Sequence, residues 1–210
     1  MSANTSADRA PASSSTSASS WPTSARRLRI RVPTARPPAD KGAPTFRLDR
    51  PITGLKVGLR HEGSWRSWML IVEEWQAFLR RDGATPVVVK TGERTAEEGE
   101  RTRTLVKEWA ESVDCGISGL GTCGSCTSWS VHDAVSLEKQ KRPAIVAATS
   151  EFAQHAHNMA NHLGHKDLKV LVLPYPLEAR PEPELRKIAF EYYPKFLELL
   201  GATAAQGAKK

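Results

Sequence analysis

Five short apolar segments alternate with longer segments of helical periodicity, and this alternation most constrains the fold of the chain. The expected strands are Leu55–Arg60, Thr85–Lys90, Val113–Ser118, 143–149 and Leu168–Pro174. The expected helices cover about 65–81, 94–112, 126–141 and 151–163, with a last one from about 183 that Pro194 should kink or break. Alternating strands and helices form βαβ units, whose strands are parallel and covered on both faces. We therefore predict an α/β fold: a Rossmann-like or flavodoxin-like doubly wound sandwich with a mainly parallel five-stranded sheet.

The N-terminal segment differs in composition from the rest of the chain. Residues 1–46 are rich in Ser, Ala, Arg and Pro, so we predict a disordered basic arm there. Residues 47–200 are expected to form a single α/β domain and 201–210 a flexible tail. Residues 1–50 hold nine Lys and Arg against three Asp, which is +6 of the chain's net charge of +7. Because the basic character belongs to the arm, the domain is expected to have no nucleic-acid partner.

Signals for the cellular compartment are sparse. The chain holds no apolar run of 18 or more residues, which predicts no membrane-spanning segment. The arm has no continuous apolar region typical of a secretory signal, although a Ser- and Arg-rich start resembles an organelle transit peptide. Three cysteines are too few for a disulfide scaffold and fit a reducing compartment. We predict a cytoplasmic protein, and leave open that the arm targets an organelle or docks a partner subunit.

The expected fold places a site where loops follow the strands. Ligands of doubly wound sheets lie beyond the carboxyl ends of the strands, which here brings together the loops at 60–66, 91–94, 119–128 and 149–150. In the first loop, Arg60 or Arg66 could hold a carboxylate or phosphate bidentately. His61 and Ser64 are further candidate substrate contacts, and Ser64 could equally be the N-cap of the following helix.

The third loop carries two of the three cysteines, Cys123 and Cys126, where a helix is expected to begin. Free amide groups and the positive end of the helix dipole favour the thiolate form of a cysteine there. A Cys-x-x-Cys pair can also close on itself and so resolve a covalent intermediate. His132 could orient or deprotonate a thiol, or it could be a surface residue. The remaining cysteine, Cys115, lies in an expected buried strand and is predicted to pack in the core. Small residues around the pair are further candidates for substrate binding: Thr122, Gly124, Ser125, Thr127 and Ser128.

Metal and nucleotide sites are less well supported by the sequence. A structural zinc site usually takes two such cysteine pairs, and the chain has one. His155 and His162 fall two helical turns, about 10.5 Å, apart, so they cannot bind one ion by themselves. Glycines 119, 121 and 124 have the spacing of a dinucleotide-binding loop, but no acidic residue follows about 20 residues later. We expect no metal and no bound cofactor, only an external dithiol reductant.

The segment around the cysteine pair, TCGSCTSWSVHDAVSLEKQKRPAIVAATSEF, resembles the cysteine form of the UGSC family. That family is named for a selenocysteine-Gly-Ser-Cys motif, and many of its members carry cysteine in the first position. The resemblance continues to VLVLPYPLEARPEPEL and covers roughly residues 52–190. More distantly, the arrangement is similar to the B-type subunits of the glycine, betaine and proline reductases. The resemblance implies that Cys123 is the nucleophile and Cys126 the resolving thiol.

These observations together predict a thiol-dependent reductase or oxidoreductase that acts on a small molecule. Cys123 would attack the substrate, Cys126 would then form a disulfide with it, and a thioredoxin-like donor would restore both thiols. One alternative is a non-redox enzyme for group transfer or hydrolysis, with Cys123 as nucleophile and His132 as base. Another is a non-catalytic subunit or binding module with structural or metal-bound thiols. A homo-oligomer is compatible with each of these.

Overall fold

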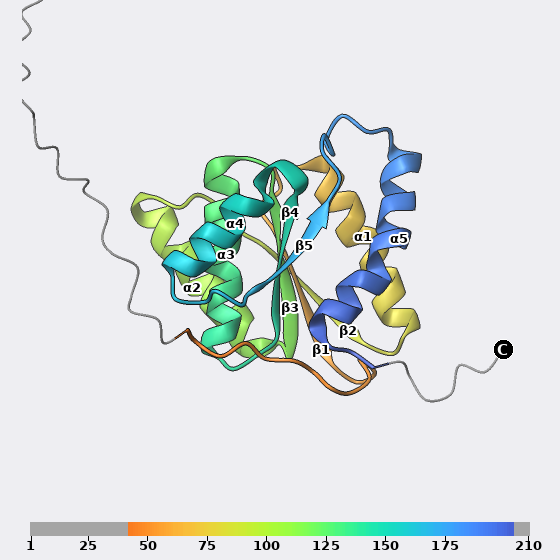
Figure 1. Ribbon diagram of the computed structural model, residues 1–210, viewed down its shortest axis with the longest axis horizontal. Helices are drawn as coiled ribbons and strands as arrows, with labels where there is room; N and C mark the ends of the chain where they lie inside the picture. Colours follow the sequence, from red (N-terminus) through yellow and green to blue (C-terminus); the bar gives the residue numbers. More distant parts are fainter. Residues whose placement is uncertain (1–41, 204–210) are drawn as a thin grey trace, which may run out of the picture. The chain divides into compact units, whose positions relative to one another are not determined.

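The computed structural model describes residues 42–203, and its strands and helices alternate along the whole of that range (Figure 1). The predictions for residues 1–41 and 204–210 lie outside the described residues. The strands are β1 (Lys56–His61), β2 (Thr85–Lys90), β3 (Cys115–Gly121), β4 (Ala144–Thr149) and β5 (Lys169–Leu173). The helices are α1 (Arg66–Arg81), α2 (Ala96–Ser112), α3 (Gly124–Lys139), α4 (Ser150–His162) and α5 (Glu182–Leu200).

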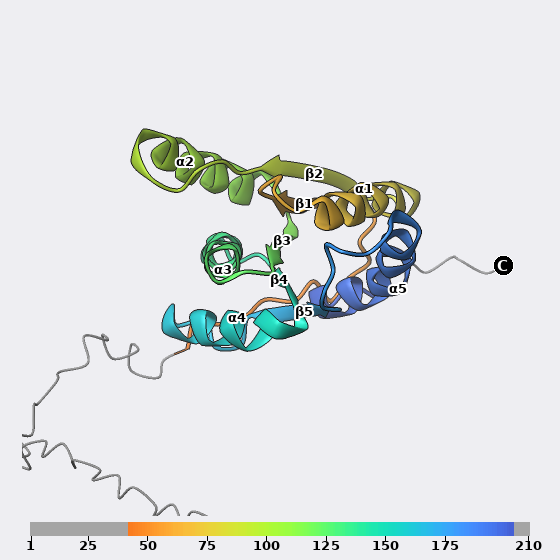
Figure 2. The ribbon, with the colours of Figure 1, turned by 90° about the horizontal axis from the view of Figure 1, so that it is seen from above.

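All neighbouring strands are parallel, in the order β2-β1-β3-β4-β5. Figure 2 shows α1 and α5 on one face of the sheet and α2, α3 and α4 on the other. The predicted doubly wound α/β sandwich is confirmed, and the strand order is that of flavodoxin-like folds. In this order the chain reverses direction across the sheet between β1 and β3, so the loops after these two strands meet at the switch point.

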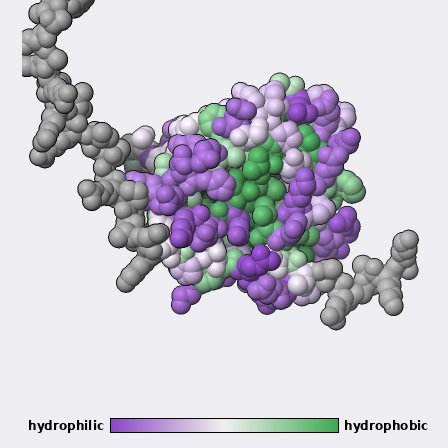
Figure 3. All heavy atoms as spheres, in the orientation of Figure 1, coloured by the Kyte–Doolittle hydropathy of each residue, from purple (hydrophilic) through white to green (hydrophobic). Residues whose placement is uncertain are grey.

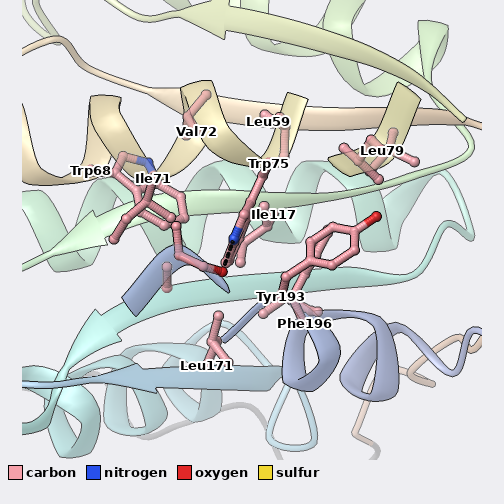
Figure 4. Packing of buried hydrophobic residues seen from close by; sticks show 14 of the residues in the cluster. Leu59, Trp68, Ile71, Val72, Trp75, Leu79, Ile117, Leu171, Tyr193 and Phe196 are labelled. Atoms are coloured by element: carbon pink, nitrogen blue, oxygen red, sulfur yellow. Dashed lines mark hydrogen bonds between the residues drawn. The ribbon is translucent and has the colours of Figure 1, made fainter. Parts of the chain in front are cut away.

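The larger part of the core lies between the sheet and the helices α1 and α5 (Figure 4). The rings of Trp75 and Phe196 stack with their centroids 4.8 Å apart, and the Trp75 indole N–H donates to the Ala189 carbonyl over 2.8 Å. A fully buried tryptophan keeps this polar group satisfied while it removes a large apolar surface from water. The core therefore joins α1 to α5 and fixes both helices against the sheet.

The structure differs from the sequence predictions in helices α3 and α5. Helix α3 begins at Gly124, two residues before the predicted start, because Cys123 serves as its N-cap. Helix α5 continues through Pro194, so Pro194 does not break it, and the alternative of a kink there stays a prediction. Proline removes one backbone hydrogen bond, to the carbonyl four residues earlier. That residue is Phe190, which is 65% exposed, so this turn of the helix lies at the surface.

The ends of the described chain pack against the body. The Ala43 N–H donates to the Gly164 carbonyl, so at least part of the segment predicted as arm contacts the domain. Pro51 forms an isolated parallel bridge with Thr203. No helix between residues 42 and 203 is long and apolar enough to cross a membrane.

One edge of the sheet is formed by β5, whose only strand partner among residues 42–203 is β4. Figure 3 shows apolar atoms gathered near the centre of the face on which β5 lies in Figure 1. Val172 of this strand is 41% exposed. The expected homo-oligomer stays a prediction.

Candidate active site

The cysteine pair lies at the switch point, in the short connection from β3 to α3. All seven residues of β3 are buried, and the chain leaves the sheet at Gly121. Cys123 has an extended backbone and caps α3: its sulfur accepts the N–H of Cys126 over 3.1 Å. The predicted position of the pair, at the N-terminus of a helix, is therefore confirmed.

Cys123 and Cys126 form a disulfide. Both are partly exposed, and the hydroxyl of Ser125 lies 3.6 Å from the Cys123 sulfur. The free cysteine Cys115 is buried, as predicted. Burial raises the pKa of Cys115 to about 12, so this thiol stays protonated and unreactive at neutral pH. Of the three cysteines, only Cys123 and Cys126 at the N-terminus of α3 are therefore suited to thiol chemistry.

Several predicted substrate-binding residues hold the motif in place. The Thr127 hydroxyl donates to the Cys123 carbonyl over 2.6 Å, and Thr127 is buried. Ser128 donates to the Gly124 carbonyl over 3.0 Å. Thr122 lies 3.4 Å from the hydroxyl of Thr149 at the end of β4. These bonds fix the first turn of α3, which is a positioning role.

A pocket of about 570 Å³, which we call the disulfide pocket, opens beside the cysteine pair. Three residues of α3 contribute to its wall: Ser125, Cys126 and Trp129. The loop after β1 contributes Glu62 and Ser64, and the rest of the wall comes from the end of β2 and the start of α2: Lys90, Thr91, Gly92, Glu93, Arg94, Thr95 and Glu98. Its volume lies in the range of small-molecule sites. Of the predicted contacts, Ser64, Ser125 and Cys126 therefore meet around one space.

Arg60 does not reach this pocket. Its side chain is fully buried, and one of its terminal nitrogens donates to the Gly119 carbonyl over 2.8 Å and to Ser130 over 3.3 Å. Its Nε lies 2.8 Å from Asp133, close enough for an ion pair although the N–H is not aimed at that oxygen. Burial lowers the pKa of Arg60, and the Asp133 carboxylate opposes that shift. The predicted substrate contact by Arg60 is thus wrong in this structure: the side chain joins β3 to α3 beneath the site.

Asp133 joins this buried cluster to the pocket. Its two oxygens accept hydrogen bonds from the two terminal nitrogens of Arg94, over 3.0 and 2.6 Å. The Arg94 guanidinium also lies 5.2 Å from the centre of the Trp129 ring. One buried carboxylate therefore holds Arg94, and the guanidinium of Arg94 lies over Trp129. Sequence reasoning placed the Arg94 loop at this edge but had no signal for its pairing with Asp133.

Arg66 and His61, the other candidates from the first loop, do not line the disulfide pocket. Arg66 is the first residue of α1, and its guanidinium lies 3.6 Å from Glu182 of α5. The backbone N–H groups of Arg66 and Ser67 both donate to the Glu178 carboxylate over 3.0 Å. That carboxylate occupies the N-terminus of α1, so Ser64 is not needed there as a cap. His61 is half-buried, and burial, with help from the neighbouring cations, lowers its pKa, so it is neutral at pH 7.

The two histidines near the motif differ in their contacts. His132 is exposed, its ring lies 5.5 Å from the Trp129 ring, and it does not line the disulfide pocket. His155 of α4, by contrast, lies with Nε2 3.1 Å from both the Gly124 carbonyl and the Ser128 hydroxyl. A carbonyl only accepts, so a hydrogen bond to Gly124 requires the proton on Nε2. His155 therefore acts as a donor that holds α4 to the first turn of α3, a contact that the sequence did not predict.

Within residues 42–203, no group of three or more His, Cys, Asp or Glu side chains is arranged to hold a metal ion. The histidines of α4 that invited a metal interpretation are dispersed: His155 contacts α3, and His157 is exposed.

The model of a family described as the UGSC family matches residues 29–202. No curated protein matches the chain significantly. The matched range includes the cysteine pair and every described strand and helix.

Proposed function

The chain belongs to the UGSC family, and from that membership and the geometry of its cysteine pair we propose that it is a thiol-dependent reductase of a small molecule. The observation that carries the proposal is the disulfide between Cys123 and Cys126 at the N-terminus of α3, beside a pocket lined by Cys126. Two thiols that reach one another can store and release two electrons. A helix N-terminus stabilises the thiolate that such chemistry needs.

The proposed cycle starts from the reduced pair. The Cys123 thiolate attacks an electrophilic atom of the substrate, forms a bond from sulfur to that atom, and expels a leaving group with its electron pair. The Cys126 thiolate then attacks the Cys123 sulfur, which forms the disulfide and releases the rest of the substrate as an anion that takes a proton. The substrate gains two electrons and the cysteine pair loses two. A dithiol donor restores the pair.

The surroundings of the pair support the first step. In the disulfide form the Cys123 sulfur already accepts the N–H of Cys126, and Ser125 is the nearest hydroxyl. The same groups would stabilise negative charge on that sulfur once the pair is reduced. No histidine is required as a base, because the thiolate is favoured by amides and the helix dipole. Cys126, Trp129 and Ser64 would contact the substrate in the pocket.

The test uses reduced protein and small electrophiles of different bond classes: a dialkyl disulfide, an α-halocarboxylate and a hydroperoxide. We expect at least one of them to yield one Cys123–Cys126 disulfide per molecule reduced, seen by mass mapping of alkylated peptides, with Cys115 unmodified. Cys123→Ser should abolish the reaction. Cys126→Ser should stop after one turnover, with the substrate fragment attached to Cys123. Cys115→Ala is the matched control and should react like the wild type.

Two results would contradict the proposal. Full multiple turnover by Cys126→Ser would indicate non-redox chemistry at Cys123 alone. A pair that dithiothreitol cannot reduce reversibly would indicate structural thiols.

A further inference from the structure

The disulfide pocket continues into a second hollow along α2. This hollow, which we call the α2 groove, has a volume of about 720 Å³. Its wall is formed by the end of β2 and by α2: Lys90, Thr91, Gly92, Glu98, Glu100, Arg101, Thr102, Thr104, Leu105 and Glu108. Lys90, Thr91, Gly92 and Glu98 line both spaces, so the two adjoin. A small substrate needs only the disulfide pocket, and the groove beside it offers room for something longer.

The two adjoining spaces carry an excess of uncompensated negative charge. Two of the cations there are already paired: Arg94 donates hydrogen bonds to Asp133, and Arg101 forms an ion pair with Glu97 over 2.5 Å. Glu93 in the pocket and Glu108 in the groove have no ion pair with any residue in the range 42–203, and neither has Lys90, which lines both spaces. Two unpaired carboxylates against one unpaired ammonium leave the lining with a net negative charge. Leu105 in the groove is 39% exposed and adds an apolar contact. A ligand that suits this surface is elongated, partly apolar and basic.

The two sulfur atoms of the disulfide differ in their position relative to the disulfide pocket. Cys126 lines the pocket, whereas the sulfur of Cys123 accepts an amide N–H at the helix N-terminus. A nucleophile that arrives through the pocket therefore meets Cys126 first. Cys123 is the better leaving group, because the amide and the helix dipole stabilise its thiolate.

We propose that the reductant is a polypeptide dithiol whose basic, extended, cysteine-bearing segment lies along the α2 groove and attacks Cys126. This inference rests on the proposed function. The donor thiolate forms a bond to the Cys126 sulfur, the bond between Cys126 and Cys123 breaks, and Cys123 leaves as the thiolate. The second donor thiol, as its thiolate, then attacks the first donor sulfur and releases Cys126. The donor ends as a disulfide, and two electrons have passed to the protein.

The test measures the reduction of the oxidised full-length protein by three probes. Two are Cys-x-x-Cys peptides of equal length, one flanked by lysines and one by glutamates, and the third is dithiothreitol. We expect the lysine peptide to react roughly tenfold or more faster than the glutamate peptide at low salt, with the difference shrinking as salt is added. Glu108→Lys should remove most of this preference and leave the dithiothreitol rate unchanged. Glu73→Lys is the matched control: Glu73 is exposed on α1, on the opposite face of the sheet, and should keep the preference.

The point of attack is tested with a lysine-flanked peptide that carries a single cysteine. After a rapid acid quench, peptide mapping should find it attached to Cys126. Attachment to Cys123, or equal rates for the two charged peptides while dithiothreitol still reduces the pair, would overturn this inference and leave the proposed function standing. A disulfide that none of the probes reduces would instead overturn both.

Discussion

Replacement of Arg60 by methionine tests whether the buried cluster beneath the disulfide pocket holds the site together. Methionine keeps the length and the apolar stem of the side chain but removes the guanidinium. The change deletes the hydrogen bonds to Gly119 and Ser130 and the ion pairs to Asp133 and Glu62. Removing one partner of a buried ion pair costs about 3–5 kcal/mol, because a charge is left without compensation.

Asp133 keeps its paired bonds to Arg94 in this variant, so its charge remains compensated. We therefore expect the lower end of that range, a loss of about 3 kcal/mol in the free energy of unfolding by urea at pH 7. Arg66→Met is the matched control: its guanidinium is half exposed and lies 3.6 Å from Glu182, so the loss should stay below about 1 kcal/mol. If Arg60→Met and Arg66→Met unfold at the same urea concentration, the buried cluster does not stabilise the fold and the reasoning is refuted.

Three further predictions concern single groups. Burial raises the pKa of Glu138 from 4.5 to about 7, so between these values the folded protein holds a proton that the unfolded chain has lost. Stability should therefore fall by up to about 3 kcal/mol as pH rises through this window, and urea titrations of Glu138→Gln should not show the decline. In reduced protein, the rate of Cys123 alkylation by iodoacetamide should level off at least about one pH unit below the value near 8.5 that is typical of free cysteine. A levelling at or above 8.5 would mean that the helix N-terminus does not activate this thiol. His155→Gln, which keeps an N–H donor for the Gly124 carbonyl, should retain most of the alkylation rate of Cys123, whereas His155→Ala should lower it; equal rates would exclude a positioning role.

The fold could be predicted from the sequence because each strand is a compact apolar run. The segment AIVAAT of β4 is buried throughout, and its apolar composition has no competing interpretation at that length. The strand order was not predictable, since both common doubly wound orders share the same alternation of strands and helices. The sequence left open whether Pro194 kinks or breaks α5, because local propensity says nothing about whether water can hydrogen-bond to the carbonyl that proline leaves free.

The position of the cysteine pair could be predicted from the sequence, but the burial of Arg60 beneath it could not. Within β1, Val57 and Leu59 face the core with α1 and α5, and Gly58 and Arg60 alternate toward the other helices. An Ala at position 58 would place its Cβ 2.6 Å from the Trp109 ring, so this second face is also tightly covered. A pattern of Gly and Arg resembles a solvated face, and only the distant partner Asp133 makes burial of the charge tolerable.

The histidines also show that nearness in sequence does not predict contact with the cysteine pair. His132 is near the cysteines in sequence, yet six residues on a helix carry it about 9 Å along the axis and about 120° around it from Cys126. His155 is 29 residues away from Cys126, but parallel crossovers bring the first turns of α3 and α4 to the same edge of the sheet. The contact of His155 with the first turn of α3 therefore follows from the topology of the fold and not from the local sequence. His155, the histidine that touches the motif, donates to a carbonyl and does not contact a cysteine sulfur. We therefore expect the backbone amides at the N-terminus of α3 to activate Cys123. The proposed chemistry depends on that helix terminus and not on a cysteine–histidine pair.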